Sequence, residues 1–195
     1  MEELNTEDKI IKAAEKVFVR DGYDGARMQA IADEAEINKA MLHYYFRSKE
    51  KLFEQIIQRK MTAFLPKIQM ILQTEMSVID KLEAIVEGYL GMLTKNPQLP
   101  MFLLFSTYRN PDILQHMPRQ VFGELVHFLN QAIKSGELTK VDPEHLVLSI
   151  MGMCIFPFVA QPIASHMLGK EKEEYIKFLK GRKKEIMKIL GTLAK

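Results

Sequence analysis

The segment from Arg27 to Lys51, RMQAIADEAEINKAMLHYYFRSKEK, constrains the fold of this chain most, because it has the spacing of two short helices joined by a tight turn. Apolar residues recur at helical intervals on each side of that turn: Ile31, Ala32 and Ala35 before it, and Leu42, Tyr45 and Phe46 after it. Two short apolar stripes need a partner surface, so we expect the two helices to pack against each other. Asn38 directly precedes the second helix, where its side chain can cap free backbone amides.

A third amphipathic helix precedes this pair. Its apolar face consists of Ile10, Ile11, Ala14, Val17 and Phe18, with Thr6 as the predicted cap and Asp21–Gly22 as the predicted end. Three such helices can close a small core that leaves the start of the last helix facing outward. The outward residues are Lys39, Ala40, Met41, His43 and Tyr44. A helix presented in this way fits the major groove of duplex DNA.

Positive charge is concentrated beside this predicted recognition helix. Residues 37–60 contain six lysines and arginines against two glutamates, whereas residues 1–36 are acidic overall. The formal net charge of the whole chain is only +2, so binding to nucleic acid must rest on this local patch. Three of its members, Lys51, Arg59 and Lys60, also fit the simpler interpretation of a solvated helix face.

The order of residues in this region resembles the amino-terminal signature of the tetracycline-repressor (TetR) family of bacterial regulators, F-x3-G-x8-IA-x2-A-x-I/V-x4-L-x-x-YF-x-S/N-K-x-x-L. The matching residues are Phe18, Gly22, Ile31, Ala32, Ala35, Ile37, Leu42, Tyr45, Phe46, Ser48, Lys49 and Leu52. The match covers the first quarter to third of the chain, and the number of fixed spacings makes it specific.

The resemblance implies an all-α fold with two domains. A three-helix helix-turn-helix DNA-binding domain would span residues 4–64, with the motif at about 27–46, and a helical effector-binding and dimerisation domain would span residues 65–195. In the family, the helix corresponding to Lys39–Phe46 reads bases, Gln29 can add a base-edge contact, and Lys49 meets a phosphate. The predicted DNA-contacting residues are therefore Arg27, Gln29, Asn38, Lys39, Ala40, Met41, His43, Tyr44 and Lys49.

Three positions depart from the family pattern. Arg27 stands where a threonine is frequent, and arginine can bind a phosphate as a charged fork. Glu36 replaces a turn glycine, so it must adopt a left-handed backbone or displace the turn. His43 replaces a tyrosine. We expect these changes to alter the preferred operator and leave the fold intact.

Beyond Leu52 the apolar spacing predicts helices throughout. Their approximate ranges are 53–72, 78–95 after a Ser77 cap, 101–108, 118–135, 143–168 after an Asp142 cap, and 170–190. The helix around Met151 is apolar nearly all round, which indicates deep burial or contact with a second subunit. The resemblance implies that the last two long helices pair with those of a second copy in a four-helix bundle, giving a homodimer on a palindromic operator. The nine lysines and arginines of residues 170–195 are interpreted as a solvated face.

Flexible methionine and flat aromatic side chains in the middle of the chain suit an apolar ligand of unknown identity. The candidate effector residues are Met101, Phe102, Phe105, Tyr108, Phe122, Met153 and Phe156, with Met151 and Phe158 nearby and Arg109, His116 and His127 as candidate polar partners. Plain core packing is the alternative for each. An effector that favours another separation of the two DNA-binding domains of the dimer would weaken DNA binding by linkage. The change in separation would come from a pivot of the helix that starts near Lys49.

Other function classes find little support. The sequence contains no glycine-rich phosphate loop, GxSxG, HExxH or CxxC motif, and its five histidines lack metal-ligand spacing. We therefore expect no catalytic residues, no metal and no cofactor. A single cysteine, Cys154, and the charged start MEELNTEDK, with no apolar run of about 20 residues, predict a cytoplasmic protein that does not enter a membrane. A helical adaptor that binds protein through its first three helices is the remaining alternative.

Overall fold

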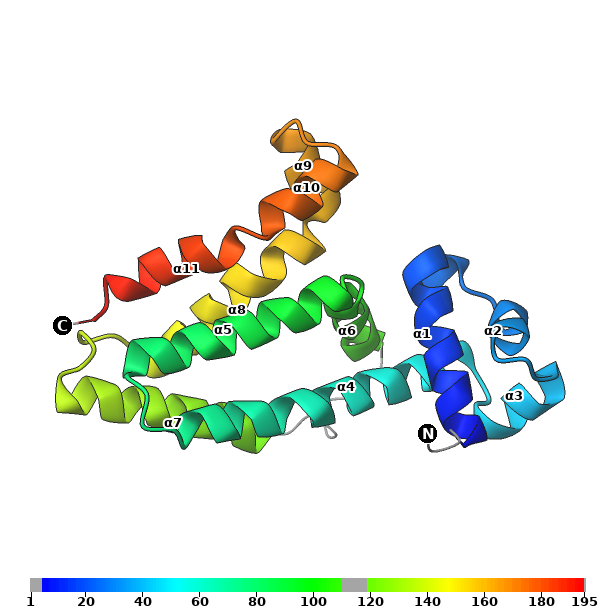
Figure 1. Ribbon diagram of the computed structural model, residues 1–195, viewed down its shortest axis with the longest axis horizontal. Helices are drawn as coiled ribbons and strands as arrows, with labels where there is room; N and C mark the ends of the chain where they lie inside the picture. Colours follow the sequence, from blue (N-terminus) through cyan, green and yellow to red (C-terminus); the bar gives the residue numbers. More distant parts are fainter. Residues whose placement is uncertain (1–4, 110–118, 195) are drawn as a thin grey trace. The chain divides into compact units, whose positions relative to one another are not determined.

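The computed structural model describes residues 5–109 and 119–194, and these residues form helices joined by short turns (Figure 1). The helices are α1 Thr6–Gly25, α2 Met28–Glu34, α3 Lys39–Tyr45, α4 Lys49–Leu72, α5 Val78–Lys95, α6 Leu99–Arg109, α7 Arg119–Ser135, α8 Pro143–Val159, α9 Gln161–Met167, α10 Lys172–Leu179 and α11 Arg182–Gly191. The predicted all-α class is confirmed.

The chain divides into two compact units, and the boundary in α4 falls between Thr62 and Ala63. Among the described residues, the first unit also takes in 102–109, and the second comprises the remainder. Assigning DNA binding to residues 4–64 and effector binding to residues 65–195 stays a prediction.

The first unit is built around α1. Asn5, and not Thr6 as predicted, caps this helix, because the Asp8 amide donates to Asn5 Oδ1 over 2.8 Å. The helix is interrupted where the sequence indicates its end, since Gly22 has φ 71°. The core of the unit is formed by Ile10, Ala14, Val17, Phe18, Ile31, Ala32, Ala35, Leu42, Phe46, Leu52, Phe53 and Ile56, all buried. This set includes most of the apolar faces predicted for the three helices.

The second unit packs α8 against α5, α7 and α11. The predicted caps are confirmed: Ser77 Oγ accepts from the Asp80 amide at 3.2 Å, and Asp142 Oδ1 accepts from the Glu144 and His145 amides. Proline follows the Asp142 cap in the first turn of α8, where its missing amide costs nothing. Contacts with these three helices bury Leu146, Val147, Ile150 and Cys154 of the apolar α8, whereas Leu148 and Phe156 stay exposed.

Two long helices predicted from the sequence are each broken in the structure. The predicted helix 143–168 ends at Ala160, and α8 and α9 meet there at 78°. Pro162 lacks the amide that would bond Phe158, which prevents the helix from continuing. The predicted helix 170–190 is divided into α10 and α11 at Lys180–Gly181, where glycine is a weak helix former.

Side chains from the last two helices supply the hydrogen bonds that proline removes from α8. Pro157 has no amide to donate to the Met153 carbonyl, and Arg182 Nε donates to that oxygen at 3.0 Å. The Pro157 carbonyl, left without a helical partner by the break, accepts from the Tyr175 hydroxyl at 2.9 Å. Tyr175 is almost fully buried, and this burial raises its pKa.

Within the described residues, no single helix has the length and apolar character to cross a membrane. Among the described helices, α8 and α9 reach that length and composition when taken together, and they are bent by 78°.

Candidate nucleic-acid interface

The turn between α2 and α3 has the geometry of a helix-turn-helix. Glu36 adopts φ 56°, so the left-handed alternative expected for this non-glycine residue is the one that occurs. The Ile37 amide then donates to the Ala32 carbonyl at 3.0 Å. Asn38 caps α3 as predicted, because its Oδ1 accepts from the Met41 amide at 2.7 Å. Local hydrogen bonds therefore fix where α3 begins.

The two faces of α3 differ sharply in burial. Leu42 is completely buried, whereas the residues predicted to face outward are exposed: Lys39, Ala40, Met41, His43 and Tyr44. Tyr44 has 83% of its surface exposed. This short, capped helix thus presents the cation of Lys39, the imidazole of His43 and the phenol of Tyr44 to solvent, together with Ala40 and Met41.

Tyr45 is a correction to the sequence analysis, which grouped it with the core. Its side chain is 41% exposed and packs edge-on against the Tyr44 ring, with centroids 5.4 Å apart. The chain leaves the helix after Tyr45, and the extended backbone of Phe46 brings that ring into the core beside Leu42. Phe46 was correctly predicted to be buried.

Helix α2 contributes two further predicted contacts. Arg27 is exposed at its N-cap position, before the first turn. Gln29 is also exposed, and its side-chain amide donates to Asp33 Oδ1 at 2.8 Å. This bond uses one of the two amide N–H groups of Gln29, so the second N–H and Oε1 remain available for a base edge.

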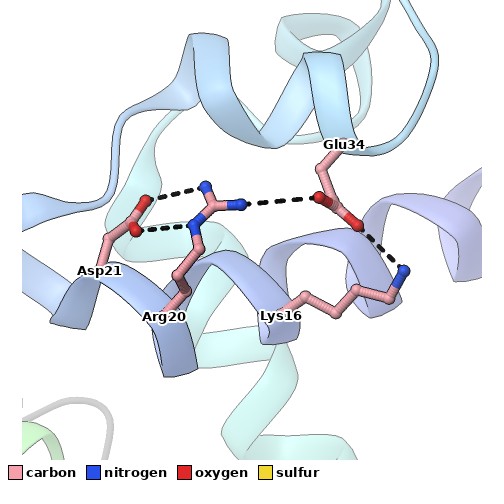
Figure 2. Close-up of polar contacts among 4 residues, drawn as sticks. All are labelled: Lys16, Arg20, Asp21 and Glu34. Atoms are coloured by element: carbon pink, nitrogen blue, oxygen red, sulfur yellow. Dashed lines mark hydrogen bonds and ion pairs between the residues drawn. The ribbon is translucent and has the colours of Figure 1, made fainter.

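Ion pairs hold α2 against α1 (Figure 2). Glu34 lies between two cations of α1, with Lys16 Nζ at 2.9 Å and Arg20 Nη1 at 3.8 Å. Arg20 also donates to Asp21, and this hydrogen bond raises the pKa of Arg20 and lowers that of Asp21. Such exposed pairs contribute little stability individually, so we assign them an orienting role.

The ammonium of Lys49 lies among backbone carbonyl oxygens of the protein itself. Its Nζ is 2.7 Å from the Tyr23 carbonyl oxygen, 3.2 Å from that of Ala26 and 3.5 Å from that of Asp24. It also lies 4.5 Å from the centroid of the Tyr23 ring. The phosphate contact of Lys49 stays a prediction.

Other cations counted in the basic patch are also paired. Lys51 binds Glu54 at 2.8 Å, and Arg59 binds Glu7 and Asp8 in the first turn of α1. The side chain of Lys60 lies outside the described part of the chain. The exposed charge beside α3 is therefore carried mainly by Arg27, Lys39 and Arg47.

The predicted effector residues are spread over several elements. Met101, Phe122 and Met153 are half-buried, whereas Tyr108 and Phe156 are 84% and 66% exposed. Phe122 lies on α7 and Met153 on α8, two helices in contact. The side chains of Phe102, Phe105 and Arg109, and all of His116, lie outside the described part of the structure. The effector site stays a prediction.

Comparison with known proteins agrees with this geometry. Residues 10–56, which contain α2, α3 and the start of α4, match the sequence model of the family described as bacterial regulatory proteins, tetR family. The HTH-type transcriptional repressor NicS of Pseudomonas putida is 28% identical over 162 residues, covering 77% of this chain and 74% of NicS.

Solved structures show the same fold over nearly the whole chain. A transcriptional regulator of the TetR/AcrR family from Thermobifida fusca is 19% identical, with a TM-score of 0.70 over 94% of this chain and 97% of that one. FadR from Bacillus subtilis, in complex with stearoyl-CoA, is 18% identical, with a TM-score of 0.66 over 92% and 96% of the two chains. Together with the residue pattern from Phe18 to Leu52, these matches show that the chain belongs to the TetR family of bacterial DNA-binding transcriptional regulators.

Proposed function

We propose that this protein is a repressor that binds a palindromic operator as a homodimer and leaves it when a small, largely apolar effector binds. The observation that carries the proposal is the difference in burial between the two faces of α3. Leu42 is buried in the core, whereas Lys39, His43 and Tyr44 face solvent. The similarity to the repressor NicS supports repression as the mode of control. This role requires no catalytic centre, and we expect the protein to act in the cytoplasm.

Dimer formation is supported by apolar side chains exposed on the C-terminal helices. These are Leu148 and Phe156 on α8, Ile163 and Met167 on α9, Ile176 and Phe178 on α10, and Ile189 on α11. A soluble monomer gains nothing by exposing so many large apolar groups in one part of its chain. A twofold dimer would place two α3 helices about 34–36 Å apart, on successive major-groove faces of a palindrome.

An apolar effector is supported by the half-buried Phe122 and Met153 on the adjacent helices α7 and α8. FadR of Bacillus subtilis, which has the same fold, was solved with stearoyl-CoA, and we propose a ligand with a long acyl chain as the first class to test. Effector and operator would weaken each other's binding by the same factor, because both act on one conformational equilibrium.

Selection of bound duplexes from a random pool tests the DNA-binding role. We expect a palindrome to be enriched, and Lys39→Ala to change the enriched sequence, whereas Lys172→Ala, a charge change on the exposed face of α10, leaves it unchanged. Failure to enrich any palindrome, combined with a stable monomer in sedimentation at micromolar concentration, would favour the protein-binding adaptor.

The selected duplex then serves to test the effector. Stearoyl-CoA titrated into the complex should release DNA at concentrations at which coenzyme A alone does not, because the acyl chain supplies the apolar contact. If both compounds leave the complex intact, the acyl-chain class is wrong for this protein.

A further inference from the structure

The ammonium of Lys49 is placed at the carbonyl end of α1. Its three acceptors, the backbone oxygens of Tyr23, Asp24 and Ala26, follow Gly22, where the helix is interrupted. The last carbonyls of a helix lack partners within it and carry partial negative charge, so a cation is favourable there. An ammonium has three N–H donors, and three carbonyl oxygens lie within hydrogen-bond distance of this one.

The first two residues of α4 both hold Tyr23. The ring of Tyr23 packs edge-on against Phe53 and lies under the Lys49 ammonium, while its hydroxyl donates to Glu50 Oε1 at 3.1 Å. The pKa of Glu50 is lowered, mainly by a hydrogen bond from its own backbone amide and a second from Ser48. The start of α4 therefore binds both the backbone of the segment Tyr23–Ala26 and the side chain of Tyr23.

This segment leads directly into the helix-turn-helix. Ala26 is followed by Arg27, the N-cap of α2, and the Ile31 amide donates to the Arg27 carbonyl at 3.1 Å. A change in the backbone at Tyr23–Ala26 must therefore move the start of α2, which carries Arg27 and Gln29. The Lys49 bonds thus set the direction in which α2 begins.

We propose that Lys49 is a positioning residue, which governs DNA affinity by holding Tyr23–Ala26 and the start of α2 and does not contact a phosphate. To reach a phosphate, the ammonium would have to give up carbonyl oxygens that it already binds. The proposal rests on DNA binding by α3, and it assigns to Lys49 a role different from the one that the family resemblance implies.

The test compares three variants on the palindromic duplex selected by the wild-type protein, with circular dichroism confirming that each is folded. Lys49→Met removes the ammonium and keeps an unbranched stem, and Lys49→Arg restores a cation with several N–H donors. Lys51→Met is the matched control, since it removes the same charge from the same turn at a side chain paired with Glu54. Affinity is measured at several salt concentrations, and amide hydrogen exchange is followed at Ala26 and Ile31.

We expect Lys49→Met to weaken binding roughly tenfold by the same factor at every salt concentration, as loss of a charge-assisted hydrogen-bond set implies. Exchange at Ala26, whose amide donates to the Gly22 carbonyl, should become faster. Lys49→Arg should recover most of the affinity, and Lys51→Met should leave exchange at Ala26 unchanged.

A salt dependence that becomes shallower by about one unit in Lys49→Met, with unchanged exchange at Ala26, would identify a phosphate contact and overturn the proposal. Affinity unchanged in folded Lys49→Met would overturn it as well. If the wild-type protein selects no duplex, the DNA-binding role itself fails, and that result is distinct because it precedes any variant.

Discussion

Replacing Glu36 by glycine should stabilise the protein. Glu36 holds the turn between α2 and α3 with φ 56°, a conformation in which the Cβ of an L-residue crowds the following carbonyl. The left-handed backbone costs roughly 1–2 kcal/mol, and glycine gives back about 0.4–1 kcal/mol through the greater freedom of its unfolded chain. We expect the free energy of unfolding to rise by about 0.8 kcal/mol, the difference between the midpoints of these two ranges.

Glu36→Ala is the matched control, because it removes the same charge and keeps the Cβ. Urea unfolding followed by helical circular dichroism should rank the glycine variant above both alanine and wild type. Both variants should bind DNA slightly more tightly, since each removes an exposed negative charge just ahead of α3. An alanine variant as stable as the glycine variant would refute the argument from backbone strain.

Three further outcomes can be checked with single substitutions or reagents. Asn38→Ala should lower the free energy of unfolding by about 1 kcal/mol, measured by urea unfolding, because the α3 amide of Met41 loses its cap. Leu42→Ala should lower the free energy of unfolding by about 2–5 kcal/mol in the same assay. Tyr44→Ala should change it by less than about 0.5 kcal/mol and should weaken operator binding in gel shifts. Equal losses of stability in the two variants would contradict the assigned faces of α3. Burial raises the pKa of Cys154 to about 12, so an aromatic disulfide reagent at pH 8 should label it only after unfolding, and rapid labelling of the native protein would count against that burial.

Features decided by neighbouring residues were predictable from the sequence. The caps at Asn38, Ser77 and Asp142 each join a side chain to an amide two or three residues ahead, so the residue types suffice to identify them. Glu36 is similar, because a non-glycine residue in a tight turn leaves few backbone choices. The faces of α3 followed from helical periodicity, except at Tyr45, the last residue of the helix, whose ring packs edge-on against Tyr44 and does not enter the core.

Features decided by distant partners were not predictable. The position of Lys49 depends on carbonyls at the far end of another helix, and Arg59 pairs with Glu7 and Asp8 some fifty residues earlier in the chain. The only sequence signal for the second pairing was an acidic first turn in α1, which also fits simple dipole stabilisation. Helical periodicity places charged residues on one face of a helix, but it does not show which of them form ion pairs with distant residues.

Two interruptions in the hydrogen bonding of α8, one at Pro157 and one at Ala160, bear on the alignment of the last two helices. An uninterrupted α-helix offers no free acceptors along its flank, because every interior carbonyl is bonded within it. Pro157 leaves the Met153 carbonyl oxygen without its amide donor, and the helix break at Ala160 leaves the Pro157 carbonyl oxygen open; Arg182 and Tyr175 donate hydrogen bonds to these two oxygens. A shift of α10 and α11 along α8 by a single residue would break both hydrogen bonds. The missing helical hydrogen bonds of α8 therefore set the register in which α10 and α11 pack against it.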